Sequence, residues 1–179
     1  MKQAGILKNT TIDITLIGMM VAVLEVCKVA LMGLPNIELT TFWIIIFTLF
    51  FGRKIIFVIP VFILLEGTMF GFQIWWIMYL YMWPSLALLT RIFRKQDSVW
   101  FWSVLSGLYG LFFGFFCAIP YVFIGAVNGG IKSGLYAGFT WWIAGIPYDL
   151  IHCIGNFVLM LVLYRPIRYA MKKVKSIVN

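Results

Sequence analysis

Acidic side chains are scarce in this sequence, in which six of the 179 residues are Asp or Glu and all charged residues together make up 11%. A soluble globular domain usually carries about 25% charged residues. Hydrophobic residues instead reach 63%, and no polar stretch is long enough to form a separate soluble domain. The composition therefore predicts one integral membrane domain over residues 1–179 in the lipid bilayer of a cell membrane.

Residues that commonly carry catalytic and metal chemistry are also few. The chain has one histidine, and its three cysteines lie in separate apolar runs at no spacing typical of a metal or redox site. It contains no G-x-S-x-G motif, no Walker A loop and no paired acidic motif. We therefore expect no enzyme activity, no metal and no cofactor, and any ATP-driven step would need another subunit.

The charge that is present is mostly basic, with a formal net charge of +8. Twelve of the 14 Lys and Arg residues lie beside the ends of apolar runs: Lys2, Lys8, Arg53, Lys54, Arg91, Arg94, Lys95, Arg165, Arg168, Lys172, Lys173 and Lys175. Such a distribution marks the cytoplasmic side of a membrane protein. The basicity thus predicts that both termini are cytoplasmic, and it does not indicate a nucleic-acid partner.

The apolar runs predict an all-α membrane protein with six transmembrane helices, at about 11–34, 38–51, 55–70, 74–90, 100–127 and 140–164. One helical span takes roughly 20 residues. The second helix, with about 14 residues, reaches only about 21 Å, so it is expected to be tilted or partly sunk in protein. The longest outer loop is expected at 128–138.

Three polar residues lie inside the last expected helix. Asp149, His152 and Asn156 are spaced by three and four positions, so they share one helical face. A carboxylate at this depth costs at least about 2.5 kcal/mol, which demands partners. The row is either a packing network between helices or a contact with a ligand. By helical rise Asp149 can reach an outer pocket, His152 is at its limit, and Asn156 is assigned to packing.

A second intramembrane group consists of Glu25, Lys28 and Glu66. Lys28 and Glu66 lie at similar depths below the outer helix ends, so Lys28 can pair with Glu66 or with Glu25. One carboxylate beyond Asp149 then stays unpaired, which disfavours an anionic ligand. Aromatic side chains near the same ends can stack on a flat or cationic ring, although most are expected to be membrane-interface anchors.

Small residues form two further faces, Gly18 with Ala22 and Gly110 with Gly114. Small residues four apart allow two helices to approach closely. Such packing is expected within the chain, while the face at Gly18 could instead receive a partner subunit.

The chain resembles the substrate-binding S component of an energy-coupling factor (ECF) transporter. The resemblance rests on the six-helix topology, the short helix after Gly33-Leu34-Pro35-Asn36, the Gly18 and Ala22 face, and the sequence Asp149-Leu-Ile-His152-Cys-Ile-Gly155-Asn156 before Arg165-Pro166. It implies a vitamin-uptake subunit that works with a transmembrane coupling (T) protein and two ATP-binding subunits. The family's docking face usually carries two alanines, where this chain has Gly18 and Ala22.

In that family the ligand lies in the outer half, below loops that here correspond to 35–38, 71–73 and 128–138. Together with the polar groups, the resemblance gives these expected substrate-binding residues: Lys28, Asn36, Glu66, Gln73, Trp75, Trp76, Tyr79, Asn128, Trp142, Asp149 and His152. The charge argument favours a pyridoxine-like compound, a pyrimidine precursor or cobalamin. The alternative is a self-sufficient secondary carrier or channel that uses Glu25, Glu66 and Asp149.

Overall fold

The computed structural model describes residues 10–178, in which all regular structure is helical. The elements are α1 (Thr10–Leu31), α2 (Thr40–Phe51), the 3-10 helix η1 (Gly52–Lys54), α3 (Ile55–Phe70), α4 (Ile74–Ile92), α5 (Val99–Leu111), α6 (Phe113–Cys117) and α7 (Ile119–Val178). The predicted all-α class is confirmed for this part of the chain. Lys2 and Lys8, two of the basic residues that predict the membrane orientation, lie outside the described residues.

Three continuous helical stretches are long and apolar enough to cross a membrane by length and composition: Thr11–Leu31, Thr40–Phe70 and Val99–Ile177. The six separately predicted spans therefore do not correspond to six separate helices in the described residues. The second and third expected helices follow each other through η1 without a loop, and the last two expected helices form one helical path. What holds is the coarser statement that the chain has membrane-compatible helices.

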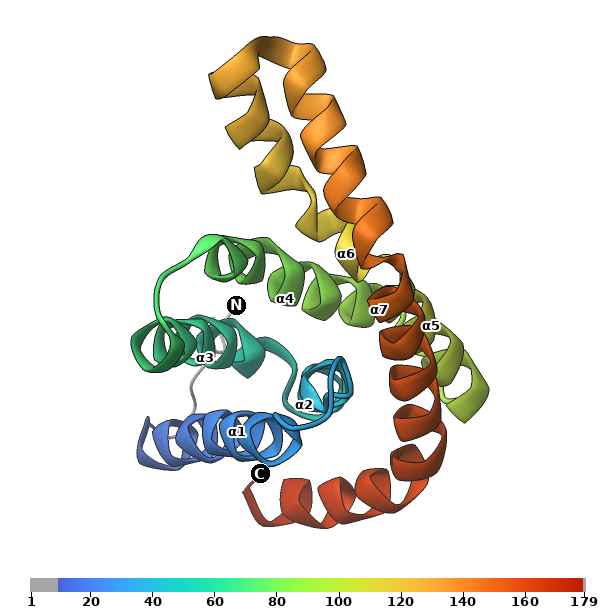
Figure 1. The fold of residues 1–179 in the computed structure, drawn as a ribbon. Helices are drawn as coiled ribbons and strands as arrows, with labels where there is room; N and C mark the ends of the chain where they lie inside the picture. The colour runs from blue at the N-terminus through green and yellow to red at the C-terminus, as the bar shows by residue number, and fades with distance from the viewer. Residues whose placement is uncertain (1–9, 179) are drawn as a thin grey trace.

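The short second helix forms the centre of the core. Eight of the 12 residues of α2 are buried, and Ile44, Ile45 and Ile46 have no exposed surface. A helix that is apolar on all sides is expected to be surrounded by protein. The C-terminal half of α7 bends past α2, as Figure 1 shows in red, and α2 also packs against α4. The helix that is too short to span alone is thus sunk in the bundle.

The expected loop at 128–138 is wrong, because this segment is the turn and second arm of a helical hairpin. Within α7 the backbone leaves helical angles at Gly129 and Gly130, where Gly130 has a φ of 79°. The other glycines serve packing: a Cβ on Gly134 would lie 2.4 Å from the carbonyl oxygen of Val122 on the opposite arm. The hairpin, yellow to orange in Figure 1, projects away from the other helices.

The expected single helix at 100–127 is also corrected, because it is broken twice. The helix α5 ends at Leu111, the five-residue helix α6 follows Phe112, and α7 begins at Ile119. Pro120 lies in the first turn of α7, where its missing N–H costs no helical hydrogen bond. The first arm of the hairpin therefore leaves α5 at an angle (Figure 1). The last expected helix, placed at 140–164, likewise extends from the hairpin turn to Val178.

The two small-residue faces have different surroundings. A Cβ on Gly110 would lie 2.8 Å from the carbonyl oxygen of His152, so α5 and α7 approach closely at this point. Gly18 and Ala22 are exposed on α1, and a Cβ on Gly18 would meet nothing within 4 Å. Packing within the chain thus uses the face at Gly110 and, among the described residues, leaves the face at Gly18 uncovered.

Candidate functional site

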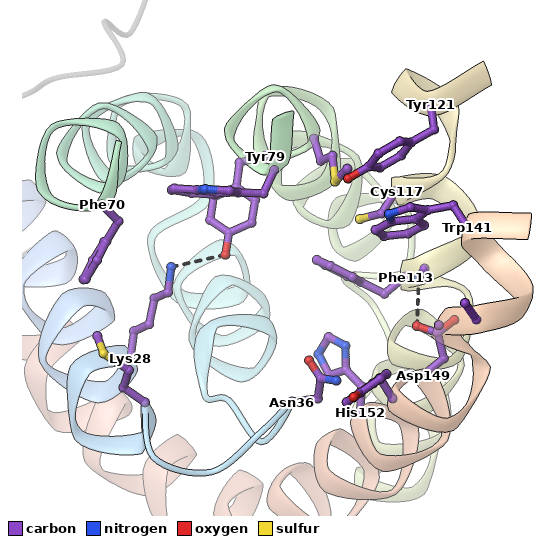
Figure 2. Close-up of a pocket in the computed structure, with 17 residues that line it drawn as sticks. Lys28, Asn36, Phe70, Tyr79, Phe113, Cys117, Tyr121, Trp141, Asp149 and His152 are labelled. Carbon is purple, nitrogen blue, oxygen red and sulfur yellow. Dashed lines mark hydrogen bonds between the residues drawn. The ribbon is translucent and has the colours of Figure 1, made fainter. Parts of the chain in front are cut away.

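A cavity of about 670 Å³ lies between the ends of α1, α3 and α4 on one side and α6 and α7 on the other (Figure 2). Six of the eleven expected substrate-binding residues line it: Lys28, Asn36, Trp75, Tyr79, Asp149 and His152. Its volume lies within the roughly 300–1,000 Å³ typical of small-molecule pockets. The cavity thus brings together two polar groups that the sequence places 121 positions apart, at Lys28 and Asp149.

One end of the cavity is formed by Lys28. Its ammonium forms an ion pair with Glu66 and donates a hydrogen bond to the hydroxyl of Tyr79 at 3.2 Å. The ammonium also lies 5.4 Å from the ring centroid of Phe70 and 5.5 Å from that of Trp75, which are cation–π distances. Figure 2 shows Lys28 pointing toward Tyr79 across this end of the cavity. Of the two ion pairs considered from the sequence, the structure has the one with Glu66.

Glu66 is placed behind Lys28 and does not line the cavity. Its side chain is fully buried, and its Oε1 has no hydrogen-bond partner among the described residues. On α1, both carboxyl oxygens of Glu25 are also buried, and neither has a hydrogen-bond partner among the described residues. Lys28 is therefore held by a buried acidic group and brings little free positive charge to the cavity.

Asp149 forms the opposite end, and the break between α5 and α6 explains its position. Gly114 lies in the first turn of α6, where a backbone N–H has no helical partner. This N–H donates to Asp149 Oδ1 at 2.9 Å, and Figure 2 draws this bond. Oδ2 is buried and has no partner within the described residues. Asp149 therefore keeps one hydrogen-bond acceptor unused at the cavity wall.

His152 and Asn156, one and two turns further along α7, have different partners. His152 Nε2 lies 3.2 Å from Glu38 Oε1, which also accepts a hydrogen bond from Thr41 at 3.2 Å. Asn156 does not line the cavity, and its Nδ2 lies 3.4 Å from Thr41 Oγ1. The polar row thus has two cavity residues followed by one packing residue. Glu38 was not among the expected site residues.

Aromatic rings form the wall around Asp149. The ring of Phe113 packs edge-on against His152 with centroids 4.9 Å apart, and Tyr121 stacks on Trp141 at 4.7 Å with an interplanar angle of 21°. Tyr148 also lines the cavity. Figure 2 shows Tyr121 and Trp141 at the base of the hairpin, above Asp149. A flat apolar ring is well matched to such a wall.

Four further expected residues lie away from the cavity. Gln73 is exposed at the start of α4, and Trp76 donates its indole N–H to the carbonyl oxygen of Ile63 at 2.7 Å. Asn128 is exposed near the tip of the hairpin, where its amide bonds to the carbonyl oxygen of Ile124. Trp142 packs edge-on against Phe115, with centroids 5.2 Å apart.

Helical spacing in the sequence distinguishes Trp141, which lines the cavity, from Trp142, which does not. A helical face centred on His152 includes Trp141, eleven positions earlier, whereas Trp142 is rotated by about 80° from the centre of that face. Centring the face on Asp149 favours Trp142 and leads to the wrong neighbour. No helical spacing in the sequence predicts that Phe113 and Gly114 line the cavity, because their positions depend on the helix break at Phe112.

Trp141→Ala is expected to weaken ligand binding by at least about tenfold, because it removes the ring that stacks on Tyr121 at the cavity wall. Trp142→Ala is the matched control and is expected to change the dissociation constant by less than about threefold. Equilibrium binding of the two purified variants to any small molecule that co-purifies with the wild-type chain measures both values. Equal losses in the two variants would contradict the assignment of Trp141 to the site.

Within residues 10–178, no group of three or more His, Cys, Asp or Glu side chains is arranged to hold a metal ion. Comparisons of the chain with protein-family models, with curated proteins and with solved structures give no match. The function is therefore argued from the cavity and the residues that form it.

Proposed function

We propose that this chain is the substrate-specificity (S) component of an ECF transporter, and that it binds a vitamin or vitamin precursor for ATP-driven uptake by partner subunits. In this proposal the helical path crosses the bilayer six times, with both termini in the cytoplasm. The partners are a transmembrane coupling protein and two ATP-binding subunits. The cavity would open to the outside.

The observation that carries the proposal is the cavity of about 670 Å³ with one polar end at Lys28, the other at Asp149, and aromatic rings between them. Ligand pockets combine a mostly apolar lining with a few polar groups that fix orientation. Asp149 also has the unused acceptor that a bound ligand could satisfy. A packing network alone would leave this buried oxygen without a partner, which costs free energy.

The charges around the cavity favour a neutral or cationic ring compound. Lys28 is paired with Glu66, so it is poorly available to an anion, while Asp149 offers an acceptor next to aromatic rings. A hydrogen-bond donor or a positive charge on the ligand would pair with this oxygen. The volume favours a compound of one or two rings, such as a pyridoxine-like or pyrimidine compound, over cobalamin.

The proposal is tested by gentle purification of the chain from its native membrane, followed by identification of all bound proteins and small molecules by mass spectrometry. The expected result is a second membrane protein, two nucleotide-binding proteins and a small ring compound. Gly18→Leu is expected to lose the proteins and keep the compound, since the Gly18 face is exposed on α1. Recovery of the chain alone, from cells without such partners, would overturn the proposal.

Asp149→Asn is expected to weaken binding of the co-purified compound by more than about tenfold, because the amide is neutral and can present an N–H where the ligand needs an acceptor. Asp97→Asn is the matched control: Asp97 is paired with Arg168 and does not line the cavity. Equilibrium binding to both folded variants measures the effect. Unchanged affinity in Asp149→Asn would assign Asp149 to helix packing.

A second candidate function is a self-sufficient carrier or channel for protons or cations, favoured by one observation. Glu25 and Glu66 both hold buried carboxyl oxygens without hydrogen-bond partners in the described structure, and intramembrane carboxylates of this kind often lie on ion pathways. This function predicts gradient-driven flux in liposomes that contain only this chain. The S component predicts no flux in the same liposomes, so the measurement separates the two.

A further inference from the structure

Five basic side chains from three distant parts of the chain meet around a second cavity, of about 470 Å³. Arg53 and Lys54 belong to η1, Arg91 lies in the last turn of α4 and Arg94 just beyond it, and Lys175 lies in the last turn of α7. Among the described residues that line this cavity, none is acidic. Five basic side chains from three separate parts of the chain thus surround one cavity, which their number alone does not require.

The local negative charges do not balance this cluster. Asp13 pairs with Lys54, which removes one positive charge. The C-terminal turns of α2, α4 and α7 all supply residues to the same cavity, and each helix end is equivalent to about half a negative charge. Of five positive charges, about two to three therefore remain for a ligand. Membrane orientation needs basic residues on one side of the bilayer, but it does not require that they surround one cavity.

We propose that this cavity binds the phosphate of an anionic phospholipid headgroup. The cavity lies at the ends of apolar helices, which is where headgroups lie in a bilayer, and Arg side chains bind phosphate oxygens with paired hydrogen bonds. Leu49, Phe50 and Phe51 line the same cavity and provide apolar surface beside the basic groups. A lipid needs both kinds of surface, whereas a free phosphate needs only the basic one. Basic pockets between membrane helices are known to take such headgroups.

The experiment measures lipid binding by native mass spectrometry of the full chain in detergent, titrated with phosphatidylglycerol or with phosphatidylcholine. The wild-type chain is expected to bind one phosphatidylglycerol in preference to phosphatidylcholine. The triple variant Arg91→Gln, Arg94→Gln, Lys175→Gln is expected to bind phosphatidylglycerol at least about tenfold more weakly, since each basic group near the headgroup contributes to the attraction. It keeps Lys54 and its pair with Asp13.

The matched control is Lys95→Gln, Lys132→Gln, Lys173→Gln, which removes the same charge from positions outside this cavity. It is expected to bind phosphatidylglycerol like the wild type. Equal weakening in both triple variants would overturn the proposal, because net charge alone would then explain binding. Binding of glycerol 3-phosphate as tight as that of the lipid would overturn it in favour of a soluble anion. Unchanged lipid binding with loss of a co-purifying protein would overturn it in favour of a protein partner.

The proposal does not depend on the transport function, because it concerns the opposite set of helix ends from those that line the first cavity. The thermal unfolding midpoint of each variant, measured in the same detergent, shows whether the protein is folded. If the triple variant unfolds, Arg94→Gln alone, at an exposed side chain beyond the end of α4, provides the test. An affinity for phosphatidylglycerol equal to that of Lys95→Gln would then overturn the proposal.

Discussion

Lys28→Met is expected to lower the free energy of unfolding by about 3–5 kcal/mol, because it leaves Glu66 buried without its charge partner. The Glu66 side chain has no exposed surface, while that of Lys28 is 22% exposed. Water can therefore replace Glu66 as a partner for Lys28 more easily than it can replace Lys28 as a partner for Glu66. Reversible unfolding in mixed detergent, followed by tryptophan fluorescence, measures the loss.

The double variant Lys28→Met, Glu66→Gln separates the charge effect from the loss of packing. It is expected to be more stable than Lys28→Met alone, since the neutral amide does not leave a buried charge. Lys132→Met, at an exposed position in the hairpin, is the control and is expected to change stability by less than about 0.5 kcal/mol. Additive losses from Lys28→Met and Glu66→Gln would contradict the ion pair.

Gly114→Ala is expected to abolish measurable ligand binding, because the new methyl group would occupy the place of the Asp149 carboxylate. A Cβ on Gly114 would lie 2.3 Å from Oδ2 and 2.6 Å from Oδ1 of Asp149. Asp149 must then rotate away and lose the hydrogen bond from the Gly114 N–H. A hydrogen bond to a charged group contributes about 1.5–3 kcal/mol, so a corresponding loss of stability is expected as well.

Gly145→Ala is the matched control, because Gly145 lines the same cavity and a Cβ there would meet nothing within 4 Å. Its helical backbone accepts alanine without strain, so its stability is expected to stay equal or rise slightly. Binding assays and thermal unfolding of both variants give the comparison. Similar affinity and similar unfolding midpoints for the two variants would show that the contact between Gly114 and Asp149 is not needed.

How well the sequence predicted each helix depended on whether its ends were marked locally. The third expected helix, 55–70, agrees with α3 at both ends, because basic residues precede it and Gly71, with a φ of 94°, ends it. The prediction of a loop at 128–138 is wrong because no local feature of the sequence marks the helix that begins after Gly130. The glycines of this segment are typical of a loop, but here they let two helical arms pack together, which only the tertiary structure reveals.

The candidate site was predictable where a polar residue is costly in a membrane. Lys28, Asp149 and His152 are expected at the site for that reason and line the cavity, whereas Glu66, expected on the same ground, lies behind Lys28. Residues without such a cost could not be recognised. Phe113 looks like any core residue, and Gly114 gains its importance from the helix break at Phe112, which lies inside the expected helix 100–127, so neither could be placed from local sequence.

The length of the hairpin has a consequence for the bilayer around it. Residues 99–129 run from the start of α5 to the hairpin turn with breaks at Phe112 and Ala118, and at 1.5 Å per residue the length along this bent path is about 46 Å. A hydrocarbon core is about 30 Å thick, so this path is longer than the layer it would cross. The excess leads to the hairpin tip, where Val127 is 87% exposed and Ile131 78% exposed. In the proposed membrane orientation, we expect these exposed apolar side chains to lie at the level of the lipid headgroups and to hold the tip against the membrane surface.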